Sequence, residues 1–140
     1  MKYYIATAIS RAPFHNLVRD GLKQWGYEIT YDWTLHGSVR LTSKSRLQEV
    51  AHLESQGILD ADFVLVLLPG GRGTHVELGL SIASQKRVFI HSEDPRAFEV
   101  GPEACAFHHH ACVVQFSCPI ALAADSLQNL LLSSANSIFR

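Results

Sequence analysis

Five short apolar stretches, rich in β-branched and aromatic residues, recur along the chain and predict five β-strands. They cover residues 3–8, 27–31, 63–68, 87–91 and 111–116. The third stretch consists of six consecutive apolar residues. Such a run is typical of a strand that is buried on both faces, as in a parallel sheet.

Between these stretches, apolar residues recur at intervals of three and four, which predicts helices. The first predicted helix follows Ser10, a candidate N-cap, and ends at Gly26. The second follows a candidate capping box that starts at Ser45. The third begins at Thr74, another candidate N-cap, and a long fourth helix follows Pro119.

Strands and helices therefore alternate along most of the chain, and this order predicts an α/β fold. Helical crossovers between parallel strands place helices on both faces of the sheet. We expect a single domain over residues 1–140, built as a three-layer α-β-α sandwich around a five-stranded parallel sheet. The expected strand order is 2-1-3-4-5, as in flavodoxin-like and Rossmann-like folds.

The composition fits one ordinary globular domain, since 47% of the 140 residues are hydrophobic and 18% are charged. A formal net charge of −1 argues against a nucleic-acid polymer as partner. No apolar run reaches membrane-spanning length, and the first residues do not resemble a signal peptide. Three cysteines without a pairing motif are expected to be reduced, which favours a cytoplasmic protein.

A glycine-rich loop joins the third predicted strand to the third predicted helix. Pro69 and three glycines between residues 70 and 73 break the apolar pattern directly after the strand. Ligands of open α/β sheets bind at such carboxyl ends of strands. The loop amides and the N-terminus of the following helix favour an anion, such as a phosphate or a carboxylate. Glu77, expected in the first turn of this helix, adds a carboxylate to the same cleft.

Residues 60–68, the glycine loop and the segment 75–79 (His-Val-Glu-Leu-Gly) resemble the nucleoside 2-deoxyribosyltransferase family. That family includes the 2′-deoxynucleoside 5′-phosphate N-hydrolases. Its mark is an apolar strand, a loop and a Glu-Leu-Gly whose glutamate is the nucleophile. The resemblance extends over about residues 3–91 and implies Glu77 as the nucleophile.

The glycine loop has a second resemblance. Residues 69–77 fit the PGGxGTxxE signature of the lonely-guy-type nucleotide phosphoribohydrolases. Those proteins are longer and carry another glycine motif upstream, which this sequence lacks. Both families cleave the N-glycosidic bond of a nucleoside or nucleotide, so the two resemblances imply one reaction class.

Cleavage of this bond builds positive charge at C1′ of the sugar, which a carboxylate can stabilise or attack. Glu77 is the candidate for this role. A second acid must protonate the leaving base or orient the sugar. The resemblance implies Glu54 as this second acid, at a position where many family members have aspartate. Asp60 and Asp62 are alternatives for the same role.

Candidate substrate-binding residues come from three segments. Residues 4–10 are similar to the family's substrate-cradling N-terminal segment, the glycine loop offers amides for a 5′-phosphate, and the loop after the second strand offers an aromatic face for the base. The candidates are Thr7, Ile9, Ser10, Asp32, Trp33, Gly71, Arg72, Gly73 and Thr74.

Structural interpretations compete with these roles. Glu77 can close a capping box with Thr74, and Glu54 can be a solvated helix acid. Asp32 and Trp33 can form a packed loop with an aromatic plug.

His108, His109 and His110 lie between Cys105 and Cys112, but this spacing matches no common zinc site. We therefore interpret that segment as a structural loop or an interface and expect no metal and no cofactor. The C-terminal helix is apolar on more than one face, which favours a homodimer or a higher homo-oligomer.

The sequence thus predicts an enzyme that acts on the N-glycosidic bond of a small-molecule nucleoside or nucleoside 5′-monophosphate. Deoxyribosyl transfer and hydrolysis share the first half-reaction, and both stay open. The alternatives are a non-catalytic nucleotide-binding module and an NAD-type glycohydrolase.

Overall fold

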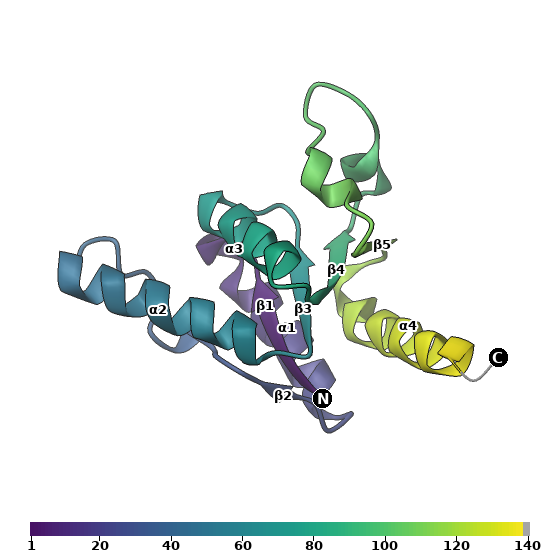
Figure 1. Ribbon diagram of the computed structural model, residues 1–140, viewed down its shortest axis with the longest axis horizontal. Helices are drawn as coiled ribbons and strands as arrows, with labels where there is room; N and C mark the ends of the chain where they lie inside the picture. Colours follow the sequence, from purple (N-terminus) through teal and green to yellow (C-terminus); the bar gives the residue numbers. More distant parts are fainter. Residues whose placement is uncertain (139–140) are drawn as a thin grey trace.

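The computed structural model describes the backbone of residues 1–138 and the side chains of residues 1–134. It shows a five-stranded sheet between two layers of helices (Figure 1). The strands are β1 (Lys2–Ala6), β2 (Glu28–Ile29), β3 (Phe63–Leu67), β4 (Arg87–Ser92) and β5 (Val113–Ser117). All neighbouring strands are parallel, in the order β2-β1-β3-β4-β5, so the predicted fold class and strand order are confirmed.

The main helices are α1 (Ala12–Lys23), α2 (Lys44–Asp60), α3 (Arg72–Ala83) and α4 (Ala123–Ile138). Side chains alternate across the sheet, so odd and even positions of β1 and β3 bury against different helices. Tyr3 and Phe63 belong to the apolar cluster of α1 and α4, whereas Tyr4 and Val64 belong to the cluster of α2 and α3. Among the described residues, no helix has the length and apolarity needed to span a membrane.

α2 lies very close to the sheet at Gly57. A Cβ atom at this position would lie 2.8 Å from Tyr31 Cβ and 3.1 Å from the Tyr4 ring. The Thr30 hydroxyl also donates a hydrogen bond of 2.6 Å to the Gly57 carbonyl. Glycine therefore sets how near α2 can approach Tyr4.

Two helices begin earlier than the sequence pattern predicts. Ser43, not Ser45, caps α2, because its hydroxyl accepts a hydrogen bond of 3.0 Å from the Arg46 amide. Gly71 precedes α3, and the Thr74 hydroxyl accepts a hydrogen bond of 3.0 Å from the Gly71 amide. Thr74 is thus the third residue of α3 rather than its N-cap.

Two further expectations about local structure are wrong. Glu77 lies in the second turn of α3 and closes no capping box with Thr74, because α3 starts at Arg72. Ser10 lies in a 3₁₀ turn (Ile9–Arg11) and does not cap α1 with its side chain. The Glu77 carboxyl is therefore not engaged in a capping box, which was the structural alternative to its role as a nucleophile.

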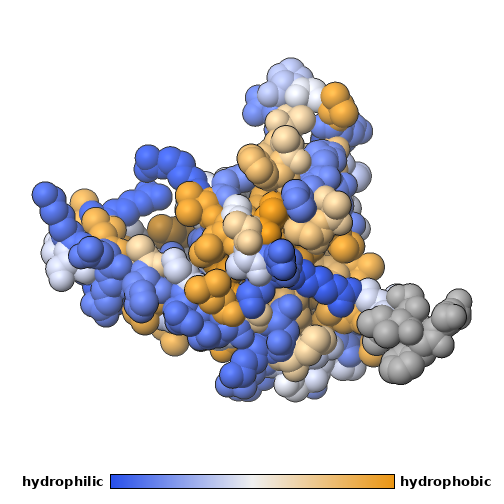
Figure 2. All heavy atoms as spheres, in the orientation of Figure 1, coloured by the Kyte–Doolittle hydropathy of each residue, from blue (hydrophilic) through white to orange (hydrophobic). Residues whose placement is uncertain are grey.

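The connection between β4 and β5 contains two 3₁₀ turns, Pro95–Phe98 and Ala106–His109, instead of a helix. This green segment projects beyond the carboxyl ends of the strands at the top of Figure 1. In the space-filling view of the same face, apolar side chains gather over α3, and hydrophilic ones cover much of α2 (Figure 2).

We expect Gly57→Ala to destabilise the fold, because the added methyl group overlaps Tyr31 and Tyr4. The expected loss in the free energy of unfolding is about 1–3 kcal/mol, typical of overpacking. Gly79→Ala is the matched control in α3, where a Cβ would meet nothing within 4 Å. Alanine should stabilise that helix by up to about 1 kcal/mol. Urea unfolding measures both changes, and equal effects at the two positions would contradict the close approach of α2.

Candidate active site

A cavity of about 670 Å³ opens at the carboxyl ends of β1 and β3, the edge where open α/β sheets bind ligands. α2 and α3 form two of its walls, and the loop after β2 forms a third. The residues that the sequence predicted and that line it are Thr7, Ile9, Ser10, Trp33, Glu54, Gly71, Arg72, Gly73, Thr74 and Glu77. The fold thus brings ten predicted site residues from four segments of the chain to one cavity.

Glu77 points into this cavity from the second turn of α3. Although the residue as a whole is partly exposed, its Oε2 atom is buried and has no hydrogen-bond partner among the described residues. Burial raises the pKa of the Glu77 carboxyl to about 8 from an ordinary value of 4.5. The Tyr4 hydroxyl lowers this pKa, and the charge of Glu54 raises it further.

Glu54 enters the same cavity from α2. It is partly buried, and burial raises its pKa, while nearby His36 has the opposite effect. Two carboxyl groups therefore share one cavity, and the charge of Glu54 disfavours the ionised form of Glu77. Pairs of acids whose environments shift their pKa values are typical of sites for acid–base or nucleophilic chemistry.

Two groups around the acids were missed by the sequence reasoning. The Tyr4 hydroxyl is buried and faces Glu77, but the two groups form no hydrogen bond of regular geometry among the described residues. Burial, and then the charge of Glu77, raise the pKa of Tyr4. The alternation along β1 was the signal for Tyr4, because it places this side chain on the α2 and α3 face.

His36 is the second missed group, and it lines the cavity from the loop after β2. Its Nδ1 atom lies 2.8 Å from the Gly37 carbonyl oxygen. Because a carbonyl only accepts hydrogen bonds, Nδ1 carries the proton, and Nε2 of the neutral ring is an acceptor. Nε2 is buried without a hydrogen-bond partner in the described part of the chain, so it can accept a hydrogen bond from a ligand.

The N-terminus of α3 supplies the anion-binding side of the cavity. The first amides of a helix have no partner within the helix, and they carry the positive end of its dipole. Arg72, Gly73 and Thr74 lie there. The Gly71 amide is different, because it already donates to the Thr74 hydroxyl. Gly70 must lie close to Thr74 in this turn, since a Cβ at Gly70 would be 2.5 Å from Thr74 Cγ2.

Residues at the end of β1 close the cavity from the sheet side. The Thr7 hydroxyl donates a hydrogen bond of 2.8 Å to the Leu67 carbonyl, which ties the ends of β1 and β3 together. Ile9 and Ser10 are exposed in the turn that follows. Thr7 is thus engaged within the protein, whereas the Ser10 side chain is open to a ligand.

The loop after β2 contributes Trp33 but not Asp32. Trp33 is only 4% exposed, and its Nε1 donates a hydrogen bond of 2.9 Å to the Ile5 carbonyl. Asp32 is absent from the cavity wall and accepts a hydrogen bond of 2.7 Å from Arg19. Burial alone would raise the pKa of Asp32, but hydrogen bonds from Thr34 and Arg19 lower it. Asp32 is therefore in a structural environment, and Trp33 is a fixed wall of the cavity.

The alternative acids Asp60 and Asp62 lie just before β3, at the amino ends of the strands and therefore at the opposite end of the sheet from the cavity. Asp62 accepts a hydrogen bond of 2.7 Å from the Lys2 amide, and Asp60 accepts one of 2.9 Å from Gln56. Neither lines the cavity of Glu77. Between these alternatives and Glu54, the geometry favours Glu54 as the second acid.

Comparison of the sequence with protein-family models and with curated proteins gives no match. In three dimensions the chain is similar to the structure of Clostridium botulinum CMP N-glycosidase, BcmB, with a TM-score of 0.64 and 15% sequence identity. The alignment covers 91% of this chain and 99% of that chain. At this identity the likeness establishes a shared fold over nearly the whole domain.

Glu77→Gln should change how the stability depends on pH. The unfolded carboxyl ionises near pH 4.5, whereas the folded one keeps its proton to about pH 8. Across that window the folded state binds the extra proton, so wild-type stability falls as pH rises. Glutamine does not ionise, so the variant does not lose this stability. The unfolding temperature of the variant minus that of the wild type should therefore increase from pH 4.5 to about pH 8.

Thermal unfolding at several pH values measures this difference. Glu49→Gln is the matched control, because Glu49 is an exposed acid of α2 that pairs with Arg46 at 2.8 Å. A Glu77→Gln difference that stays constant across the window would contradict the burial of this carboxyl.

Proposed function

We propose that this protein cleaves the N-glycosidic bond of a nucleoside or nucleoside 5′-monophosphate, with Glu77 as the nucleophile. The observation that carries the proposal is the pairing of Glu77 and Glu54 in one cavity at the N-terminus of α3. The resemblance of residues 60–79 to the deoxyribosyltransferase family supports the same reaction. So does a fold shared with a protein described as a CMP N-glycosidase.

In this proposal the sugar lies with C1′ over Glu77. The bond from C1′ to the base nitrogen breaks, its electron pair leaves with the base, and a Glu77 oxygen forms a bond to C1′. Positive charge that develops at C1′ favours the ionised form of the nearby carboxyl. The Tyr4 hydroxyl, which lowers the pKa of Glu77, favours the same form.

Glu54 is the proposed acid for the leaving base. A base nitrogen that departs with an electron pair needs a proton, and a carboxyl with a raised pKa is a suitable source near neutral pH. Burial provides that raised pKa at Glu54. His36 lies close enough to influence Glu54 and offers a second polar contact to the base.

The 5′ end of the substrate belongs at the N-terminus of α3. The amides of Gly73 and Thr74, with the Arg72 side chain and the Ser10 hydroxyl, suit a phosphate at this end of the cavity. Trp33 forms the fixed wall against which the substrate packs. In the proposal, Glu77, one helical turn beyond Gly73, lies next to the sugar rather than the phosphate.

The glycosyl–Glu77 ester has two possible fates. Water attack at C1′ releases the sugar and restores the carboxyl, which is hydrolysis. Attack by the nitrogen of a second base gives a new nucleoside, which is transfer. Both outcomes use the same residues, so the acceptor decides between them.

The test is incubation of the purified protein with nucleosides, 5′-monophosphates and NAD, with and without a free acceptor base, followed by chromatography of the released bases. We expect release from a nucleoside or a 5′-monophosphate. Glu77→Gln should lower the rate by about a thousandfold, because the nucleophile is lost. Glu54→Gln should lower it by about a hundredfold, within the range for general acids.

Glu49→Gln controls for the loss of an acid from α2 and should retain the wild-type rate. Mass spectrometry of the protein quenched during turnover should show a glycosyl group on the peptide that contains Glu77. Full activity of Glu77→Gln would exclude the proposed mechanism. Ligand-induced thermal stabilisation without any base release would instead identify a non-catalytic nucleotide-binding module.

A further inference from the structure

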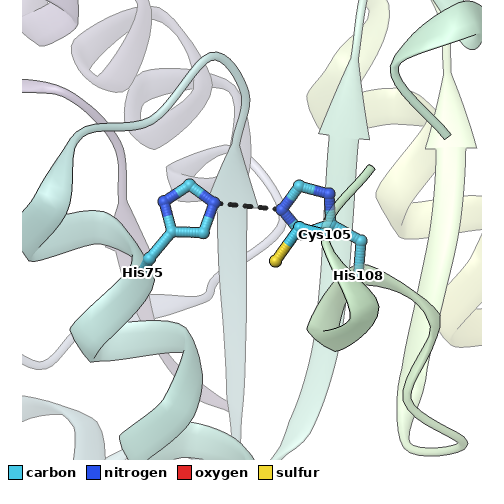
Figure 3. A group of neighbouring side chains, drawn as sticks. All are labelled: His75, Cys105 and His108. Atoms are coloured by element: carbon cyan, nitrogen blue, oxygen red, sulfur yellow. Dashed lines mark hydrogen bonds between the residues drawn. The ribbon is translucent and has the colours of Figure 1, made fainter. Parts of the chain in front are cut away.

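A second cluster of reactive side chains lies on the other side of the α3 N-terminus. It consists of His75 from α3 and of Cys105 and His108 from the segment between β4 and β5 (Figure 3). One ligand atom from each residue lies within 4.8 Å of the other two. The Nε2 atoms of the two histidines face each other at 3.1 Å, with the Cys105 sulfur beside them (Figure 3).

The hydrogen bonds around His75 prepare its Nε2 atom to bind a metal. His75 Nδ1 lies 2.9 Å from the Gly71 carbonyl oxygen, so Nδ1 carries the proton of the neutral ring. Nε2 then presents a lone pair. A carbonyl that orients the far nitrogen of a ligating histidine is the usual outer contact of protein metal sites.

Within residues 1–134, the side chains of Cys105 and His108 make no hydrogen bond besides the one between the two histidines. His108 is 6% exposed, and its Nδ1 atom has no hydrogen-bond partner among the described residues. Cys105 is a free, partly buried thiol. With the His75 proton on Nδ1, the proton between the two rings belongs to His108 Nε2. When a metal ion takes its place, neutral His108 carries this proton on its unpartnered Nδ1 atom instead, and both Nε2 atoms bond to the ion.

The distances fit a tetrahedral ion. Ordinary zinc bond lengths place two ligating nitrogens about 3.3 Å apart, and a nitrogen and a sulfur about 3.6 Å apart. The observed separation of 3.1 Å between the two Nε2 atoms is close to the nitrogen–nitrogen value. The ligand atoms of all three residues lie within 4.8 Å of one another, a range that includes the nitrogen–sulfur value. Imidazole and thiolate together favour zinc over magnesium or calcium, which prefer oxygen ligands.

We propose that His75, Cys105 and His108 bind a zinc ion. Three protein ligands leave the fourth tetrahedral position for a water molecule. A cavity of about 560 Å³ adjoins the cluster and gives that water access. The ion joins the segment that contains the Ala106–His109 turn to the first turns of α3 and so fixes this segment to the domain.

The proposed site differs from our sequence-based expectation that the protein binds no metal. That expectation considered residues 105–112 alone, where the spacing matches no zinc motif. The third ligand, His75, comes from a helix 30 residues earlier in the chain than Cys105. Only the fold brings the two segments together.

The experiment uses the full chain without a histidine tag, stripped of metal with a chelator and then titrated with zinc. We expect one zinc ion per chain and a rise in the unfolding temperature, because the ion binds the folded state. Cobalt(II) in place of zinc should give an intense near-ultraviolet band from thiolate-to-metal charge transfer. Cys105→Ser should abolish this band, and His108→Ala should weaken zinc binding about a hundredfold.

Cys112→Ser and His109→Ala are the matched controls, because both residues lie in the same segment but outside the cluster. They should bind zinc as the wild type does. Circular dichroism of the metal-free variants checks that each is folded. Absence of stoichiometric zinc binding by the folded wild type would overturn the proposal, as would equal binding by wild type and Cys105→Ser. Both readouts are independent of glycosidic activity.

Discussion

Glu77 reaches its cavity because the Gly71 amide donates a hydrogen bond to the Thr74 hydroxyl at the start of α3. This bond begins the helix directly after the loop from β3, and the close approach of Gly70 to Thr74 keeps the turn tight. Because successive residues of a helix are rotated by about 100°, His75 and Glu77 then point to nearly opposite sides. The same turn of backbone therefore serves two separate clusters of side chains.

The core determines the chemistry of the carboxyl groups. Tyr4, Ile58 and Leu78 are buried between the sheet and the α2 and α3 layer. Burial of an aliphatic side chain such as Ile58 or Leu78 contributes about 1.5–3 kcal/mol. A buried polar atom without a partner costs about 1–3 kcal/mol. A few apolar contacts thus offset the burial of Glu77 Oε2, while the exclusion of water raises the pKa of that group.

The fold was predictable because its signals are local and repeated. The apolar run of β3 and the alternation of strands with helical patterns were enough to predict the sheet order. Helix starts were less predictable, since Ser43 and Ser45 are both good caps, and only the hydrogen bond to the Arg46 amide distinguishes them. The structure places Glu77 and Glu54 in one cavity, as the motif implied, while their catalytic roles stay predictions. Asp32 could not be placed from sequence, because its contact with Arg19 joins residues on different elements.

The two edges of the sheet differ in what they offer to another chain. β2 has only two residues, Glu28 and Ile29, so few of its backbone groups are available for pairing at that edge. β5 has five residues, and β4 is its partner in the sheet. Unpaired backbone groups of an edge strand are the template on which a sheet extends. Any extension of this sheet by a second chain is therefore favoured along β5, at the edge remote from α2.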